Sequence, residues 1–281
     1  MLGAIVGDII GSVHEFSATK TKDFPLLVPR STFTDDTVLT IAVAEWVLTA
    51  GDLVALLHGY TESHPGRGYG SMYRRWASAR SREPYNSFGN GSAMRVSPVG
   101  FAFDAIEDVL SWAERSAAVT HNHPEGIRGA QAAAAAVFWA RHVRDKNEIR
   151  QRLASRFGYD LGFTLDAIRP TYRFNETCQD TVPQALVAFL ESTGYEDAIR
   201  NAISLGGDAD TLACITGGIA EAYYGVPDDL ARTCLAMLDA RGAAVVRRDL
   251  EAHVRRRRAQ RRVAHGHRQI DVALHSCSLA G

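Results

Sequence analysis

Two short segments of the chain concentrate carboxylate and hydroxyl side chains directly before apolar runs. Residues 33–37 read Phe-Thr-Asp-Asp-Thr, and residues 206–211 read Gly-Gly-Asp-Ala-Asp-Thr. Together they supply six oxygen-bearing side chains, on Thr34, Asp35, Asp36, Asp208, Asp210 and Thr211. Ligand sets made only of oxygen suit Mg²⁺, Mn²⁺ or Ca²⁺ rather than zinc. We therefore expect the two segments to face each other across a metal site.

Each segment alone has a simpler explanation, which is helix capping. Thr and Asp at a helix start accept hydrogen bonds from N–H groups that lack a partner inside the helix, and they suit the positive end of its dipole. A cap needs only one such residue, whereas each segment carries several. Carboxylates about 4 Å apart repel by roughly 4 kcal/mol at an effective dielectric near 20, and a bound cation removes that cost. The pair of segments therefore favours metal binding.

The first segment of the chain predicts a helix over Leu2–Phe16. Its glycines recur at intervals of four residues, at Gly3, Gly7 and Gly11. Such a stripe lets another backbone approach closely. Asp8 and Glu15 are two helical turns apart, so they should project from nearly the same face. Asp8 is also explained as a buried acid that ties down a loop. Glu15 would lie at a helix end where the dipole disfavours it, so we take it as a site candidate.

Two glycine-rich loops precede short helical patterns, at residues 65–71 and 87–92. Their backbone N–H groups could hold an anion at a helix start, although a plain turn followed by a serine cap is the commoner meaning of such loops. Neither loop matches the phosphate-loop or dinucleotide-binding patterns. From them we take Gly70, Phe88, Gly89, Asn90, Gly91 and Ser92 as candidate substrate-binding residues. In residues 120–124, His121 could contact a ligand, and a capping turn is the alternative.

Helical periodicity runs through nearly the whole chain, and no alternating β-branched run stands out. The pattern predicts an all-α fold of about a dozen helices without a second domain boundary. An apolar content of 46% in 281 residues is ample for a sizeable core. We expect one domain over residues 1–262, followed by a flexible tail over residues 263–281.

The composition also bears on location and partners. No apolar run approaches the roughly 20 residues of a membrane span, and the start lacks a basic region, so we expect a cytoplasmic protein. The four cysteines show no close spacing that would indicate zinc or disulfides. The net charge is −1, but residues 241–281 hold ten Arg against three acidic residues. This basic end could contact nucleic acid or an acidic surface, or be a solvated helix end.

Five motifs in series resemble those of the ADP-ribosylglycohydrolase family. They are Gly7-Asp8-Ile9-Ile10-Gly11 followed by Glu15, then residues 33–37, residues 89–95 (Gly-Asn-Gly-Ser-Ala-Met-Arg), Thr120-His121 and residues 206–211. The resemblance covers roughly residues 1–225 in order and spacing. It implies a single-domain orthogonal helical bundle with a dinuclear Mg²⁺ or Mn²⁺ centre. It also implies that the six residues of the acidic segments hold the metals, that the Gly-Asn-Gly loop holds a diphosphate and that His121 lines the ligand cleft.

The resemblance further implies hydrolysis of the glycosidic bond between ADP-ribose and an acceptor, in an ADP-ribosylated protein or small molecule. We assign catalysis to Glu15 and Asp36. Two alternatives stay open: an ADP-ribose-binding module without activity, and another dimetal hydrolase acting on nucleotides. The acceptor, which could be arginine, serine, acetyl or a nucleobase, lies outside the matched motifs. The arginine-rich end after Asp239 and the short basic loop between Val13 and Thr32 depart from the family pattern. We expect a monomer.

Overall fold

The computed structural model describes residues 1–255, which form helices and connecting loops without a β-strand. The labelled helices are α1 (Leu2–Gly11), α2 (Asp35–Thr49), α3 (Leu53–Ser63), α4 (Ser71–Ser78), α5 (Gly91–Met94), α6 (Ser97–Ala102), α7 (Ile106–Ala118), α8 (Pro124–His142), α9 (Lys146–Phe157), α10 (Leu165–Ile168), α11 (Cys178–Leu190), α12 (Tyr195–Ile203), α13 (Ala209–Tyr224) and α14 (Asp228–Leu235). A further helix covers 240–255. The predicted all-α fold is confirmed. The predicted tail and most of the arginine-rich run lie outside the described residues.

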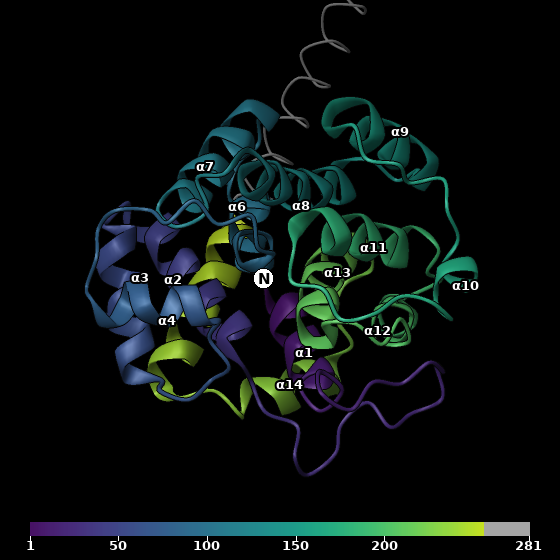
Figure 1. Cartoon of the computed structure of the whole chain (residues 1–281), viewed down its shortest axis with the longest axis horizontal. Coiled ribbons are helices and arrows are strands. Elements are labelled where there is room, and N and C mark those ends of the chain that lie inside the picture. Colours follow the sequence, from purple (N-terminus) through teal and green to yellow (C-terminus); the bar gives the residue numbers. More distant parts are fainter. Residues whose placement is uncertain (256–281) are drawn as a thin grey trace, which may run out of the picture.

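Helices α1 and α13 pack against each other at the centre of the bundle (Figure 1). A Cβ atom on Gly7 would lie 2.1 Å from the carbonyl oxygen of Ala213, and one on Gly3 would lie 2.3 Å from that of Gly217. Both distances are far inside van der Waals contact, so only glycine allows the two backbones to come this close. The predicted role of the glycine stripe is confirmed.

The other helices surround this central pair (Figure 1). Helix α2 packs on α3, and α8 packs on α6, α7, α9, α11 and α13. Helix α8 can sit among so many neighbours because its middle is a run of five buried alanines, residues 132–136. No helix among residues 1–255 combines the length and the apolar character that crossing a membrane requires.

Several helix boundaries follow from local signals. Asp52 directly precedes a helical pattern over Leu53–Tyr60, and this position predicts it as the cap. It accepts hydrogen bonds from the N–H groups of Val54 and Ala55 and so caps α3. Helix α11 begins at Cys178, three residues before the start of the helical pattern that the sequence shows over Thr181–Leu190. The short helices α6 and α10 were not expected, because four to six residues carry too little periodicity to detect. Helix α5 begins within the glycine-rich loop 87–92, which was expected to lead into a helix.

The first helix ends earlier than predicted. It stops at Gly11, where the hydroxyl of Ser12 donates back to the carbonyl of Ile9 and accepts the N–H of Thr32. This capping turn sends the chain into the long loop below α1 in Figure 1. Glu15 therefore lies on a loop rather than on the helical face of Asp8, and the prediction that they share a face is wrong.

Candidate functional site

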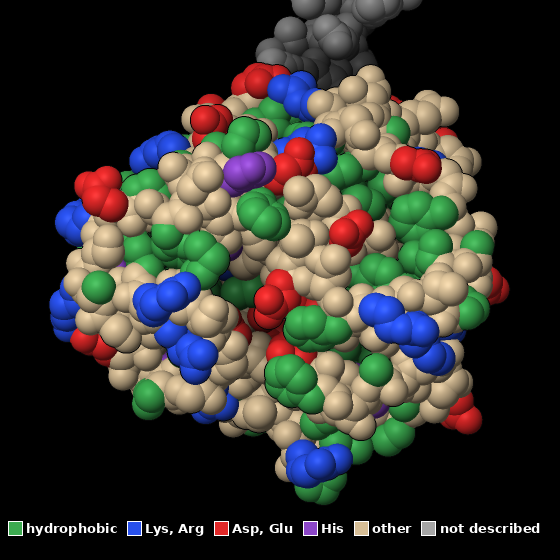
Figure 2. Space-filling view, viewed as in Figure 1, with side chains coloured by type: hydrophobic (Ala, Val, Ile, Leu, Met, Phe, Trp, Pro, Cys, Tyr) green, Lys and Arg blue, Asp and Glu red, His purple; other side chains and the backbone are tan. Residues whose placement is uncertain are grey.

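A cavity of about 310 Å³ opens where several helix ends converge. Its wall includes the starts of α2 and α13, the glycine-rich loop 87–91 and the loop that carries Glu15. Figure 2 shows acidic side chains gathered in a hollow at the centre of this face, with hydrophobic side chains around it. The cavity therefore combines a negatively charged floor with an apolar rim.

The start of α2 is held in place by Asp8 of α1. This fully buried carboxylate accepts the N–H and hydroxyl of Thr34, at 3.0 and 2.7 Å, and those of Thr37, at 3.1 and 2.5 Å. Thr34 also caps α2 by accepting the N–H of Asp36. Asp8 is thus the buried, loop-tying acid considered above. Thr34 does not line the cavity, although its neighbours Asp35 and Asp36 do.

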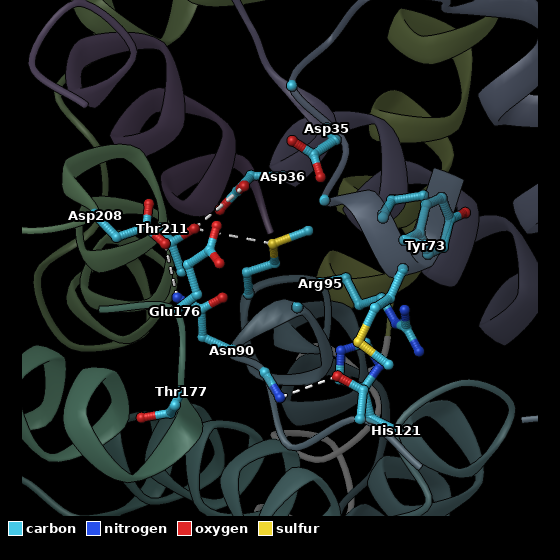
Figure 3. A pocket seen from close by; sticks show the side chains of 18 of the residues that line it. Asp35, Asp36, Tyr73, Asn90, Arg95, His121, Glu176, Thr177, Asp208 and Thr211 are labelled. Carbon is cyan, nitrogen blue, oxygen red and sulfur yellow. Dashed lines mark hydrogen bonds between the residues drawn. The ribbon is translucent and has the colours of Figure 1, made fainter. Parts of the chain in front are cut away.

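The start of α13 meets the start of α2 across the cavity floor. The hydroxyl of Thr211 donates to Asp36 Oδ2 over 3.4 Å, as Figure 3 shows. Carboxylate oxygens of Glu15, Asp208 and Asp210 lie within 4.8 Å of one another. We refer to Glu15, Asp36, Asp208 and Asp210 as the acidic cluster. Residues some 170 positions apart in the sequence are therefore neighbours here.

Asp35 occupies a separate position. In Figure 3 it lies apart from Asp208 and Thr211, on the side of the cavity that faces Tyr73. Its N–H donates to the carbonyl of Arg67 over 2.7 Å, which ties the start of α2 to the loop 65–70. Gly68 in that loop has φ +99° and leaves room for the carboxylate, since a Cβ there would lie 3.1 Å from Asp35 Oδ1.

The acidic cluster fits a cation. Asp36 Oδ1 is buried and has no hydrogen-bond partner among the described residues. Burial, followed by the charges of Asp8 and Asp35, raises the pKa of Asp36 well above its usual value, and burial followed by Asp208 and Asp36 does the same to the pKa of Asp210. Buried carboxylates that repel one another are the arrangement a divalent cation stabilises. Their all-oxygen chemistry suits Mg²⁺ or Mn²⁺.

Glu15 reaches the acidic cluster from its loop and is half-buried. Burial first, and then the negative charges of Asp208 and Asp8, raise the pKa of Glu15 to about 7. A carboxyl group with such a pKa exchanges a proton readily near neutral pH. Glu15 also lines the cavity, so this exchangeable proton lies beside the space that a ligand would occupy.

The glycine-rich loop is joined to the acidic cluster through Asn90. The amide nitrogen of this buried side chain donates to Asp208 Oδ2 over 2.8 Å and to Thr181 Oγ1 over 3.2 Å. The loop backbone pairs with residues 176–178, since the N–H of Asn90 donates to the carbonyl of Glu176. The N–H groups of Gly91 and Ser92 have no acceptor within residues 1–255. They remain available for a ligand.

The remaining predicted substrate-binding residues fall into two groups. Gly70, Phe88, Gly89, Gly91 and His121 line the cavity, and the ring of Phe88 is 46% exposed. Ser92 does not line it, because its buried hydroxyl donates to the carbonyl of Gly126 over 2.7 Å. The side chain of Ser92 therefore supports the loop from behind.

Several cavity residues were not predicted. They are Leu39, Gly68, Ser71, Met72, Tyr73, Tyr85, Asn86, Ser87, Met94, Arg95, Glu176 and Thr177. Arg95 ends a motif that the sequence singled out, but nothing in its spacing indicated that the side chain turns toward the cavity. Glu176 precedes α11 by two residues, and only its pairing with the glycine-rich loop brings it to the wall.

Comparison with known proteins agrees with this geometry. A family model described as ADP-ribosylglycohydrolase matches residues 1–268. The chain belongs to the ADP-ribosylglycohydrolase family. The match to this family runs past the arginine-rich segment, where the motifs alone gave no correspondence. The resemblance seen in the sequence is confirmed.

Curated relatives carry related names. The chain is 28% identical to ADP-ribosylhydrolase ARH3 of Bos taurus, over 83% of this chain and 87% of the relative. It is 27% identical to ADP-ribosylarginine hydrolase Tri1 of Pseudomonas putida (strain GB-1), over 80% of this chain and 70% of the relative. A solved structure titled ADP-ribosylglycohydrolase-related protein complex superposes with a TM-score of 0.65 at 24% identity, covering 90% of this chain and 96% of that one. The fold of this ADP-ribosylglycohydrolase family member is therefore shared with a solved structure.

Proposed function

We propose that this protein is a metal-dependent hydrolase that cleaves the glycosidic bond between ADP-ribose and an acceptor. Family membership and the names of the relatives support the reaction class. The observation that carries the proposal is the meeting of Thr211 with Asp36, beside a buried carboxylate oxygen that has no partner in the described chain. These features agree with a centre that holds a cation.

The residues that would hold two Mg²⁺ or Mn²⁺ ions are the oxygen-bearing ones of the two helix starts. They are Thr34, Asp35, Asp36, Asp208, Asp210 and Thr211. When bound, such cations orient the ribose hydroxyls and polarise the attacking water. Asp36 and Asp210 are buried at the cavity floor, so they are placed to anchor this centre, with Asp35 extending it toward Tyr73.

Glu15 is the residue that would move a proton. Its carboxyl group borders both the cluster and the cavity, and its pKa of about 7 without a cation lets it accept or donate near neutral pH. With a cation held by the cluster the pKa of Glu15 would be lower, and its carboxylate would serve as the base for the attacking water. The bond to the acceptor then breaks through an oxocarbenium-like transition state, as in other glycoside hydrolysis.

The nucleotide part of the substrate would lie along the opposite wall. The free N–H group of Gly91 can donate to a diphosphate, and the exposed ring of Phe88 offers a surface on which a base can stack. The side chain of Asn90 hydrogen-bonds to Asp208, so the nucleotide side of the site is connected directly to the acidic cluster.

The two alternatives predict different behaviour. A binding module without activity would bind ADP-ribose but would not release it from an ADP-ribosylated substrate. The complete set of acidic side chains, with Glu15 beside them, favours an enzyme. A phosphohydrolase acting on nucleotides usually has histidine ligands, and no histidine belongs to the acidic cluster among residues 1–255. The acceptor stays open, because only one of the two relatives' names states an acceptor, which is arginine.

The test is release of ADP-ribose from a panel of substrates. Proteins or peptides ADP-ribosylated on arginine or serine, and acetylated ADP-ribose, are incubated with the purified protein in Mg²⁺, in Mn²⁺ and in chelator. We expect free ADP-ribose from at least one substrate, only with a cation present. Asp36→Asn is the negative control. Release of AMP or inorganic phosphate in place of ADP-ribose would support the phosphohydrolase instead.

A further inference from the structure

Arg95 is a buried cation without a compensating carboxylate. Its side chain is fully buried at the end of α5 and contributes to the cavity wall. Burial lowers the pKa of Arg95, and the ionisable groups that oppose this shift are Tyr73 and Tyr85 rather than a carboxylate. Its Nε and Nη1 atoms have no hydrogen-bond partner among residues 1–255. An unpaired buried charge is strongly unfavourable, so its presence at a cavity wall points to a role with a ligand.

The remaining nitrogen of Arg95, Nη2, donates two hydrogen bonds. Nη2 donates to the carbonyl of Ser116 over 2.7 Å and to Thr120 Oγ1 over 2.8 Å. A guanidinium group can only donate, so the hydroxyl oxygen of Thr120 is the acceptor in this bond. The hydroxyl proton of Thr120 must therefore point elsewhere.

That proton has one acceptor in the described chain. Thr120 Oγ1 lies 2.8 Å from Nδ1 of His121, and both residues are buried. If Thr120 donates to Nδ1, then a neutral His121 carries its proton on Nε2. Burial and the charge of Arg95 lower the pKa of His121 well below its usual value, which keeps the ring neutral.

The other ring nitrogen faces the glycine-rich loop. A Cβ atom on Gly91 would lie 3.2 Å from His121 Nε2, and one on Gly89 would lie 3.7 Å away. Nε2 has no partner among the described residues, and the cavity reaches this ring. The space left by the two glycines is therefore where a ligand atom would meet an N–H donor.

We propose that Arg95, acting through Thr120, holds His121 in the tautomer whose Nε2–H donates to an anionic group lying against Gly89 and Gly91. Arg95 and Thr120 are positioning residues in this scheme. The unpaired charge of Arg95 also favours a negative ligand at this wall. The inference rests on the proposed function in that the anionic group is the diphosphate of ADP-ribose.

The ligand-free protein tests the tautomer directly. Nitrogen-15 NMR of the His121 ring distinguishes a proton on Nε2 from one on Nδ1. We expect Nε2–H in the wild type and in Thr120→Ser, which keeps the hydroxyl. We expect a mixture of tautomers in Thr120→Val, which keeps the shape and removes the bond. A purely structural role for Thr120 would change the melting temperature and leave the tautomer alone.

ADP-ribose titration by calorimetry gives the second readout. Thr120→Val should bind about tenfold more weakly, the effect of one lost hydrogen bond to a charged group, and Thr120→Ser should bind as the wild type does. If Thr120→Val does not fold, Arg95→Lys takes its place. It keeps the charge without the two Nη2 bonds, so it should show the same mixture of tautomers and the same loss of affinity. The proposal is overturned by Nδ1–H in the wild type, or by a folded Thr120→Val with the wild-type tautomer and affinity. A wild type that binds no ADP-ribose contradicts the proposed function, whereas the ligand-free spectra still decide the tautomer.

Discussion

The side-chain amide of Asn90 donates a hydrogen bond to Asp208 over 2.8 Å, and this bond joins the glycine-rich loop to the acidic cluster. The same nitrogen donates to Thr181, so the amide is held on both sides. The proposed nucleotide wall and the acidic floor of the cavity are therefore parts of one hydrogen-bond network. A substitution in the glycine-rich loop should therefore alter cation affinity at the acidic cluster, and a substitution in the cluster should alter ligand affinity at the loop.

Replacing Asn90 by alanine should weaken cation binding. The change leaves Asp208 without the partner that orients it, and losing such a supporting bond typically costs about 10- to 100-fold in metal affinity. Mg²⁺ or Mn²⁺ titration by calorimetry measures the effect. The control is Asn147→Ala, on the exposed surface of α9. Unchanged cation affinity in Asn90→Ala would show that Asp208 needs no orienting bond.

The double variant Asp36→Asn with Asp210→Asn should be more stable than the wild type without a cation. Both carboxylates are buried among like charges, and the amides remove that repulsion. It should also lose the rise in melting temperature that Mg²⁺ gives the wild type by binding the folded state. Asp23→Asn, on an exposed loop, is the matched control. A Mg²⁺-induced shift that survives in the double variant would place the cation elsewhere.

The chelated protein should lose stability as the pH rises. Folding raises the pKa of Glu15 from 4.5 to about 7, so the folded state holds this proton more tightly than the unfolded state. The stability linked to Glu15 is therefore complete below about pH 4.5 and is lost as the pH rises through about 7. Thermal unfolding in chelator between these values should show a falling melting temperature. Removing the charge in Glu15→Gln should flatten the fall, and Mg²⁺ should oppose it, because cations bind deprotonated ligands. A wild-type melting temperature that climbs across the window would contradict the assignment.

Glu15→Gln should lower turnover by about 100-fold or more, the typical effect of a lost general base. The amide keeps the size of the side chain and some of its hydrogen bonding. Stability without a cation should stay the same or rise, since one of several clustered carboxylates is gone. Steady-state ADP-ribose release and thermal unfolding are measured on the same sample, with Glu114→Gln on the exposed face of α7 as control. A stable variant with near wild-type turnover would remove Glu15 from the mechanism.

Gly91→Ala should weaken ADP-ribose binding by about tenfold or more. The added methyl would lie 3.2 Å from His121 Nε2 and fill the space beside the loop, and a displaced hydrogen bond to a charged group has about this effect. Gly59→Ala is the matched control, because a Cβ there meets nothing within 4 Å and should stabilise helix α3 by about 0.5–1 kcal/mol. Equal affinity in the two variants would place the diphosphate away from Gly91.

The features that the sequence predicted well are those with a local or strictly periodic cause. The glycine stripe of α1, the cap at Asp52 and the all-α pattern each depend on residues a few positions apart. The early end of α1 was missed because Ser12 is held by Thr32, twenty residues further on. The side-chain bonds of Asn90 and the burial of Arg95 were missed for the same reason, since their partners come from other helices and loops. At the site, the sequence predicted which residue types take part, namely carboxylates, hydroxyls and glycines. Which of their atoms come together is decided by packing between distant parts of the chain.

The close contact of α1 with α13 has a consequence for how the chain folds. The N–H of Gly3 bonds to the carboxylate of Glu221, a partner 218 residues away, and the glycine stripe lies on residues 210–217. Contacts of such high sequence separation slow folding, because a long loop must close before they stabilise anything. During synthesis the first helix leaves the ribosome long before its partner exists, so the acidic cluster can only assemble after nearly all the described chain has been made. The emergence of Asp208, Asp210 and α13, rather than the arrival of the first carboxylates, therefore sets the earliest moment at which the cluster can capture a cation.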